Sequence, residues 1–392
     1  MQTNRATVLA GQHYAVVGAG LMGRLMACAL AKAGAQVALF DRGSSAGEYA
    51  AATVAAAMLA PLAESAITER NVVQMGIHSL PRWKEIIADL ALPVFLQHEG
   101  TAIVWHSQDA SEAKRFGAHL ERNCLQSQLR GDASFALPQP QHLDRSALEA
   151  LEPSLAERFQ QGMFLPNEGQ LDNRQLLTAL LHELGLLQID LHWNHAVDPD
   201  GLCEQGQYDW VIDCRGLGAK AAWQENPLRG IRGEVLRLHA PEVGLKRPTR
   251  LIHPRYPIYI APKEDDVYVV GATEIESEDL SPTSVRSAME LLSAVYTVHS
   301  GFAEARILEM STQCRPTLKD NLPEIHIRKP GLMQINGLYR HGFLIAPAVL
   351  DCALEIIRAE QASDSQVSRS LASRLELNVT HAAEQEFAAC AS

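Results

Sequence analysis

A short apolar strand that runs directly into a glycine-rich turn is the feature that most limits how this chain can fold. Residues 13–17 precede Gly18, Gly20 and Gly23 in the spacing G-x-G-x-x-G, and a helical pattern rich in Ala, Leu and Met follows to Ala33. In a βαβ unit the first glycine permits the tight turn, the second lets the backbone approach a pyrophosphate, and the third lets helix and strand pack closely. The phosphates then lie on the free N–H groups at the helix N-terminus.

Residues 36–40 predict the second strand of the same unit, and this strand closes on Asp41. The acid lies about 20 residues beyond the glycines, where the 2′-hydroxyl of a ribose needs an acceptor. A carboxylate there disfavours a cofactor that bears a 2′-phosphate, because the two negative charges repel. The alternative is an unrelated βαβ unit with a glycine-rich turn. Because strand, glycines, helix, strand and acid follow in this order, the pattern favours a dinucleotide site.

Composition and charge limit the classes of partner. The chain of 392 residues is long enough for two packed domains, and its apolar content of 47% and charged content of 20% are typical of a globular protein. A net charge of −12 argues against nucleic acid or an anionic membrane surface as the main partner. The cysteines form no C-x-x-C pair, no apolar run has the length of a membrane span, and residues 1–12 lack the core of a signal peptide. We therefore expect a cytoplasmic protein without a metal site or a membrane span.

Hydrophobic periodicity predicts how the rest of the chain is organised. Helical patterns are expected in a stretch that ends near Leu90 and at 109–130, 173–184, 282–297 and 344–358, and strands at 102–105, 210–214, 305–310 and 332–336. Residues 231–274 alternate with period two, which is typical of an antiparallel sheet. Residues 164–172 are expected to form turns, and the chain from Pro316 to Leu332 is expected to form a loop.

Dinucleotide-type segments at both ends of the chain, with an antiparallel insert between them, imply domains that are discontinuous in sequence. We expect a mixed α/β protein of two domains (α+β in arrangement): a Rossmann-like cofactor domain and a second domain built on an antiparallel sheet. The cofactor domain would comprise residues 13–85, 141–222 and 311–360, and the substrate domain residues 86–140 and 223–310. Residues 361–392 would form a polar, alanine-rich tail with some mobility.

Residues 49–61 are mostly small. Such side chains let the backbone come close to a bulky, flat ligand. Composition alone fits a tightly packed alanine helix equally well, so both interpretations stay open.

Residues 210–218 predict a strand that ends in a turn at Gly216. This arrangement is expected if a second backbone segment approaches the same cofactor.

Several short blocks carry a family resemblance, and their order and spacing make chance a poor explanation. The blocks are residues 55–61 with Glu64, 230–234, 259–263 with 270–273, 315–316 and 339–347. Together with the N-terminal fingerprint, they resemble the D-amino acid oxidase family of flavoproteins, and within it the glycine oxidases of thiamine biosynthesis. The resemblance covers roughly residues 13–360.

The resemblance implies that the cofactor is FAD rather than NAD. Its ADP half would lie on the first βαβ unit, and the small-residue run near 52–58 would line the flavin. The last helix, which opens after Gly342, would aim its N-terminus at the flavin, where a positive helix end stabilises the negative charge of the reduced ring. The residues expected to bind FAD are Gly18, Gly20, Leu21, Met22, Gly23, Asp41, Arg42, Ala56, Ala57, Met58, Gly216, Arg340, His341, Gly342, Phe343 and Leu344.

The resemblance also implies three substrate-site residues. Arg315 matches the family position that pairs with the substrate carboxylate, a task that suits arginine because its fork can bond both oxygens. Arg340 matches a second active-site arginine beside the flavin, and Tyr259 matches an active-site tyrosine. Taken alone, each arginine would more often be a surface charge, and a tyrosine on an alternating strand is commonly part of the core.

The sequence departs from the family pattern at several positions. Ala57 and Asn321 replace glycines that are usual in the family, and Lys263 stands where a Pro-Arg pair is typical. Cys314 replaces an apolar residue beside the substrate arginine, and Pro257 occupies a pocket position that carries a histidine in a typical glycine oxidase. We therefore expect a retained cofactor site and an altered substrate pocket.

Three hypotheses about activity follow. In the first, the protein oxidises a small amino acid or amine by hydride transfer to flavin N5, with O₂ as the acceptor and no catalytic histidine or serine. In the second, it oxygenates a side chain of a partner protein during maturation of a quinone cofactor. In the third, it binds flavin for assembly or regulation without turnover. The sequence leaves the oligomeric state open.

Overall fold

The glycine-rich turn follows an inner strand of a seven-stranded sheet. The structure, a computed structural model, describes residues 9–129, 133–255, 257–362 and 370–382. The strand order is β18-β16-β17-β10-β1-β2-β9, and all neighbours are parallel except β16 and β17. The strands are β1 His13–Val17, β2 Gln36–Phe40, β9 Asp190–His192, β10 Trp210–Asp213, β16 Glu324–Lys329, β17 Leu332–Asn336 and β18 Asn378–His381.

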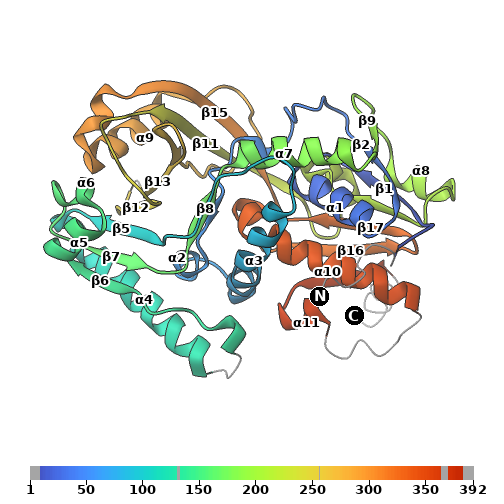
Figure 1. The fold of residues 1–392 in the computed structure, drawn as a ribbon, viewed down its shortest axis with the longest axis horizontal. Coiled ribbons are helices and arrows are strands. Elements are labelled where there is room, and N and C mark those ends of the chain that lie inside the picture. Colours follow the sequence, from blue (N-terminus) through green and yellow to red (C-terminus); the bar gives the residue numbers. More distant parts are fainter. Residues whose placement is uncertain (1–8, 130–132, 256, 363–369, 383–392) are drawn as a thin grey trace.

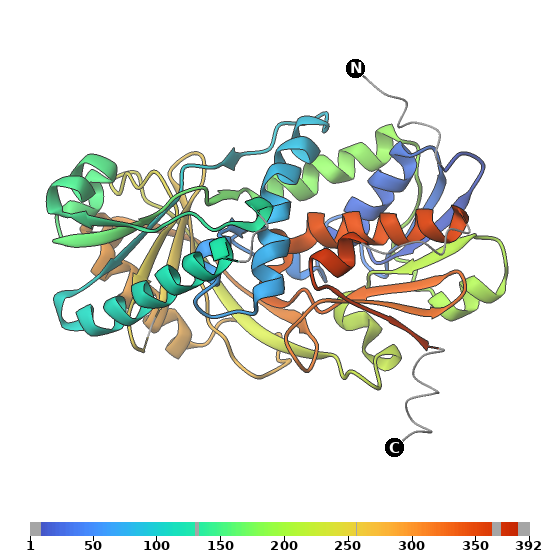
Figure 2. The same ribbon diagram turned by 90° about the horizontal axis from the view of Figure 1, so that it is seen from below.

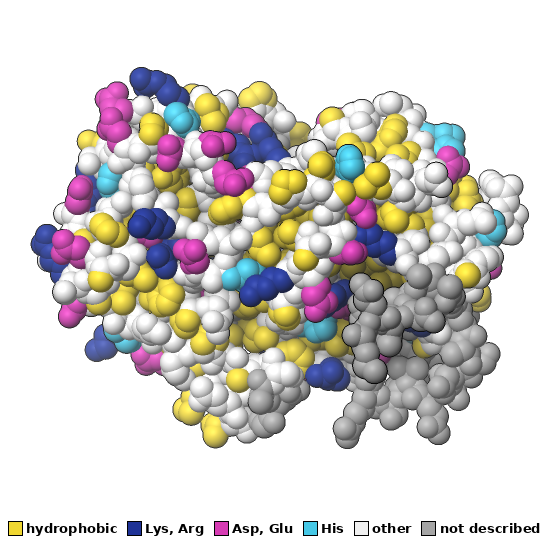
Figure 3. Space-filling model, in the orientation of Figure 1, with side chains coloured by type: hydrophobic (Ala, Val, Ile, Leu, Met, Phe, Trp, Pro, Cys, Tyr) yellow, Lys and Arg dark blue, Asp and Glu magenta, His cyan; other side chains and the backbone are white. Residues whose placement is uncertain are grey.

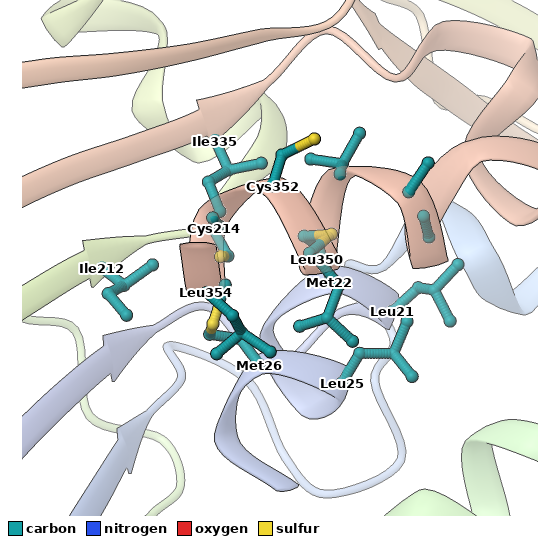
Figure 4. Packing of buried hydrophobic residues seen from close by; sticks show 14 of the residues in the cluster. Leu21, Met22, Leu25, Met26, Ile212, Cys214, Ile335, Leu350, Cys352 and Leu354 are labelled. Atoms are coloured by element: carbon teal, nitrogen blue, oxygen red, sulfur yellow. The ribbon is translucent and has the colours of Figure 1, made fainter. Parts of the chain in front are cut away.

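This sheet is buried on both faces. Along β1, Tyr14 and Val16 join one apolar cluster and Ala15 and Val17 another, as the two-residue period of a strand requires. The larger cluster includes side chains of α11 (Leu371–Arg374) and of four longer helices, and Figure 4 shows those of α1 meeting side chains of α10, β10 and β17. The longer helices are α1 Leu21–Lys32, α3 Arg70–Ala88, α7 Asn173–Leu186 and α10 Gly342–Ala362. The smaller cluster packs against α8 Pro199–Glu204.

An eight-stranded sheet forms the second part of the molecule, on the left in Figure 1. Its order is β15-β11-β14-β13-β12-β5-β7-β6, antiparallel except where β12 meets β5. One apolar cluster joins this sheet to α9 Val285–Val298 and another joins it to α4 Ala110–Leu129. The strands are β5 Thr101–Trp105, β6 Gln141–Asp144, β7 Gln161–Leu165, β11 Arg229–His239, β12 Thr249–Ile252, β13 Ile258–Pro262, β14 Val267–Gly271 and β15 Arg306–Thr317.

Short elements connect the two sheets. The strands β3 Met58–Leu59, β8 Gly169–Leu171 and β4 Leu96–Gln97 form a small antiparallel sheet, and β8 lies between the two larger sheets in Figure 1. Figure 2 shows the same division of the molecule from below. The remaining elements are α2 Pro61–Glu64, α5 Arg145–Leu151, α6 Pro153–Ala156, α11 Leu371–Arg374, and the 3₁₀ turns η1 Ala51–Thr53, η2 Ser107–Asp109, η3 Ala133–Phe135, η4 Gly216–Ala222, η5 Ser300–Glu304 and η6 Tyr339–His341.

The expected mixed α/β class is confirmed, and three local predictions are wrong. Residues 164–172 contain the end of β7 and all of β8 rather than turns alone. The stretch from Pro316 to Leu332 contains the end of β15 and the strand β16 rather than a loop. The tail expected over 361–392 contains α11 and β18, and β18 pairs with β16 at the edge of the seven-stranded sheet. Residues 363–369 and 383–392 of that tail lie outside the described residues.

The two large sheets differ from the expected domain boundaries in two regions. Residues 311–317 were assigned to the cofactor domain, but they form the end of β15 in the eight-stranded sheet. Residues 141–165 were assigned to the cofactor domain, but β6 and β7 belong to the eight-stranded sheet. The reason is that β7 pairs with β5 and β6, and such long-range pairing leaves no mark on the local pattern.

Two residues in the tight turn between β13 and β14 have a strained backbone conformation, and a substitution can relieve this strain. Asp265 and Asp266 are exposed and both have positive φ, 55° and 54°, as the central residues of a type I′ turn require. Glycine adopts this conformation without a Cβ penalty. We expect Asp266→Gly to stabilise the protein by about 0.5–1 kcal/mol and to raise the melting temperature of the holoprotein by about 1–2 °C. Asp266→Ala is the control, because it keeps the Cβ; an equal rise in that variant would contradict the explanation.

On the face shown in Figure 3, Lys and Arg side chains are interspersed with Asp and Glu. Among the described residues, no helix combines the length and apolar character that a membrane crossing needs. In the same part of the chain, His, Cys, Asp and Glu side chains form no group of three that could hold a metal ion.

Candidate functional site

One large cavity brings together residues that are far apart in the sequence. It has a volume of about 1530 Å³ and is lined by both large sheets, the small-residue run and the start of α10. This exceeds the roughly 300–1,000 Å³ of an ordinary small-molecule pocket, so the cavity has room for a dinucleotide and a small substrate. Of the residues predicted from the sequence, Arg315, Arg340, Tyr259 and all the cofactor residues except Gly23 line it.

The glycine-rich turn at one end of the cavity has the geometry of a phosphate cradle. Gly18 has a φ of +100°, and a Cβ there would lie 2.7 Å from the carbonyl oxygen of Cys214. A Cβ on Gly23 would overlap the Gly18 carbonyl oxygen, so Gly23 serves packing and does not face the cavity. Gly20 caps α1 with no side-chain hydrogen bond, and the nearest atom to a Cβ there is Ala50 Cβ at 3.8 Å. The first N–H groups of α1 are therefore open to an anion.

Asp41 lies beside this cradle. Its Oδ2 accepts a hydrogen bond from the Ala19 N–H at 2.6 Å, and its Oδ1 accepts one from the Gly43 N–H at 2.7 Å. A carboxylate has about four acceptor sites, so capacity remains for the hydroxyls of a ribose. The neighbouring Arg42 guanidinium lies over the ring of Tyr49, 4.5 Å from its centroid. These contacts place the acid where the sequence pattern requires it.

The small-residue run lines the middle of the cavity as open backbone. Only residues 51–53 form a 3₁₀ turn and 58–59 a short strand, so the alanine-helix interpretation is wrong. The buried Lys263 ammonium holds the run in place by donating to the carbonyl oxygens of Ala56, at 3.0 Å, and Leu171, at 2.8 Å. Ala57 and Asn321 both have positive φ, 53° and 63°. This explains why glycine is usual at the matching positions of the resembling family.

Helix α10 begins at the cavity wall. Gly342, Phe343 and Leu344 line the cavity, and the N–H groups of this first turn have no partner within the helix. The Trp83 indole Nε1 donates to the Phe343 carbonyl oxygen at 2.7 Å and fixes the start of the helix. The positive end of the helix dipole therefore faces the cavity, where it favours a negatively charged ring. Gly216, the first residue of η4, also lines the cavity and has a φ of +53°.

Arg315 presents its guanidinium to the cavity from β15. Both Nη atoms donate to the Thr273 carbonyl oxygen at 3.2 Å, and within the described residues the guanidinium has no carboxylate partner. A Cβ on Gly233 of the neighbouring strand would overlap the guanidinium, so glycine at that position makes room for it. Gly233 belongs to the matching block at residues 230–234, and its role is apparent only from this contact. Arg315 is thus positioned to bond an incoming carboxylate.

Arg340 belongs to a cluster of charges centred on Glu64. The Glu64 carboxylate pairs with Arg340 Nη2 at 3.0 Å, with Arg250 Nη2, and with His341 Nδ1 at 3.5 Å. Burial opposes ionisation of Glu64, but the charges of the two arginines outweigh it and lower the pKa of Glu64 to about 2. Burial lowers the pKa of His341 to about 4. At neutral pH, Glu64 is therefore ionised and His341 is neutral.

Tyr259 lines the same cavity as the three arginines Arg250, Arg315 and Arg340. Burial raises the pKa of its phenol, against the opposing fields of Arg315, Arg250 and Arg340. The phenol is therefore a neutral hydrogen-bonding group surrounded by three arginines. Arg250 was missed in the sequence analysis, and the only signal for it was a charged residue on the apolar strand at 249–252. Pro257 also lines the cavity, at the position that departs from the family pattern.

A nucleotide cradle that shares one cavity with an arginine-lined pocket defines a nucleotide-dependent oxidoreductase. The chain belongs to the family of FAD-dependent oxidoreductases that includes D-amino acid oxidase, since the family model matches residues 13–351. The expected family, enzyme class and cofactor FAD are therefore confirmed. The open helix N-termini, the free acceptor sites of Asp41 and the size of the cavity all fit this cofactor.

The chain is similar in sequence or in structure to several known oxidoreductases. The chain is 38% identical over 334 residues to the putative thiamine biosynthesis oxidoreductase ThiO of Rhizobium etli, a match that covers 85% of this chain and 93% of that protein. The crystal structure of glycine oxidase from Bacillus cereus has a TM-score of 0.73 at 19% identity and covers 89% of this chain and 96% of that one. Iminodiacetate oxidase from Chelativorans sp. BNC1 has a TM-score of 0.72 at 17% identity, with 94% and 99% covered. The chain is thus similar to ThiO and to glycine oxidase, and the partner-protein alternative is not favoured.

Proposed function

We propose that this protein oxidises the C–N bond of a small amino acid, with glycine or a similar amine as substrate and O₂ as the electron acceptor. The observation that carries the proposal is the Arg315 guanidinium, which faces the FAD cavity with only backbone carbonyls as partners among the described residues. The similarity to ThiO of Rhizobium etli and to a Bacillus cereus glycine oxidase supports an amino acid substrate.

In this proposal the side chains of the protein bind and orient the substrate rather than act as general acids or bases. Arg315 would bond both oxygens of the substrate carboxylate and so fix the orientation of the α-carbon. The neutral Tyr259 phenol would donate to the same carboxylate or accept from the amine. The start of α10 would keep positive charge beside the ring, and Arg340, held by Glu64, would border the same end of the cavity. FAD, when bound, supplies the redox chemistry by accepting a hydride from the carbon next to nitrogen.

The absorption spectrum of the purified protein tests the cofactor and the substrate together. We expect a yellow protein whose flavin band is bleached anaerobically by glycine or sarcosine and restored by air with formation of H₂O₂. Lactate, which has a hydroxyl in place of the amine, is the control and should leave the band unchanged. A flavin band that no amino acid or amine bleaches would contradict the proposal and favour binding without turnover. A cytoplasmic location remains a prediction from the sequence, which leaves the oligomeric state open.

A further inference from the structure

The charges of Arg250, Arg315, Arg340 and Glu64 act on Tyr259. Two of these arginines pair with Glu64, and the third has no carboxylate partner among the described residues. Arg250 and Arg340 both pair with Glu64, and Arg340 also lies 3.3 Å from a carboxylate oxygen of Glu274. Arg315 has no such partner among the described residues. Of the three arginines that act on Tyr259, a carboxylate entering the cavity therefore meets one without a carboxylate partner among the described residues and two that already have such partners.

Glu64 is placed so that its charge acts strongly. It is the last residue of α2, directly after the small-residue run, and its side chain is 12% exposed. The side chains of Arg250 and Arg340 are 17% and 26% exposed. Charges with this little solvent contact are poorly screened by water or salt. Without Glu64, Arg250 would be an uncompensated cation in the wall of the cavity and would attract a second anionic group.

We propose that Glu64 determines substrate specificity by neutralising Arg250 and, together with Glu274, Arg340, so that the site accepts substrates with one carboxylate and rejects those with two. The inference rests on the proposed function, since it concerns the same cavity. Glu64 acts through the arginines and is therefore a positioning residue rather than a catalytic one. The fold does not decide this preference, because the iminodiacetate oxidase of Chelativorans shares the fold and is named for a substrate with two carboxylates.

Binding of two unreactive anions measures the preference without turnover. Acetate and malonate are titrated into the holoprotein at pH 8, where both acids are fully ionised, and binding is followed by the change in the flavin spectrum. We expect wild type to bind acetate more tightly than malonate. In Glu64→Gln, which keeps the size of the side chain but removes its charge, we expect the ratio of affinities to shift toward malonate by at least about tenfold.

Two matched variants separate charge from structure. Glu64→Asp keeps the charge and should retain the wild-type preference. Glu85→Gln removes an exposed carboxylate on α3, outside the cavity, and should leave the ratio within about twofold. An unchanged ratio in a Glu64→Gln protein that still holds FAD would overturn the proposal. Malonate binding as tightly as acetate to wild type would also overturn it, whether or not Glu64→Gln folds. Failure of glycine to bleach the flavin would instead count against the proposed function alone.

Discussion

Replacing Arg315 with alanine is expected to lower kcat/KM for glycine by about a thousandfold while FAD stays bound. Of the three arginines that act on Tyr259, Arg315 is the one without a carboxylate partner among the described residues. Losing two charge-assisted hydrogen bonds in a buried site costs about 4 kcal/mol, which corresponds to about three powers of ten. Most of the loss should appear in KM, because the carboxylate is held in both the bound substrate and the transition state.

Arg315→Lys and Arg306→Ala complete this experiment. Lysine keeps the positive charge but not the fork, so Arg315→Lys should recover part of the loss and leave the α-carbon poorly oriented. Arg306 lies on the same strand, and its guanidinium donates to the Glu304 carbonyl oxygen, so Arg306→Ala should leave the kinetics close to wild type. Steady-state kinetics of peroxide formation, with flavin content measured for each variant, checks the result. A KM for Arg315→Ala equal to that of wild type would exclude the assigned role.

The parts of the fold that could be predicted from the sequence are those whose pattern is local. The first βαβ unit, α4 and α7 carry their own period and were predicted within a few residues. The strands β6 and β7 could not be assigned to the correct sheet, because their place depends on pairing with β5, far away in the chain. The strand β16 did carry a short alternating signal at Ile325 and Ile327, which was overlooked.

The candidate site also contains residues that could be predicted from the sequence and residues that could not. Gly18, Gly20 and Asp41 could be predicted because turn geometry and phosphate binding require those residues at those spacings. Arg250 could not, because its role depends on Glu64, which lies 186 positions away in the sequence. A charged residue on an apolar strand is a weak signal until its partner is known. The family resemblance located Arg315 and Arg340, but only the structure shows that Arg340 pairs with a carboxylate and that Arg315, within the described residues, does not.

Replacing Gly20 with valine is expected to abolish FAD binding while the protein still folds. Gly20 has a φ of −71°, which any residue adopts, and a Cβ there would meet no protein atom closer than Ala50 Cβ at 3.8 Å. The valine side chain would instead occupy the space in which the pyrophosphate approaches the N–H groups of α1. Losing these charge-assisted hydrogen bonds should weaken FAD binding by at least about a hundredfold. The purified variant should be colourless, with a far-ultraviolet circular dichroism spectrum like that of the wild-type apoprotein.

A substitution at Gly20 tests FAD binding separately from folding better than a substitution at a neighbouring glycine does. At Gly23 a Cβ would overlap the Gly18 carbonyl oxygen, so Gly23→Ala is expected to disrupt the turn itself. Gly185→Val is the matched control, because Gly185 lies on α7 and a Cβ there meets no atom within 4 Å. That variant should be yellow and active. If Gly20→Val bound FAD with wild-type affinity in a fluorescence titration of the apoprotein, the phosphate cradle would not lie at this turn, and the orientation of the cofactor in the cavity would have to be reversed.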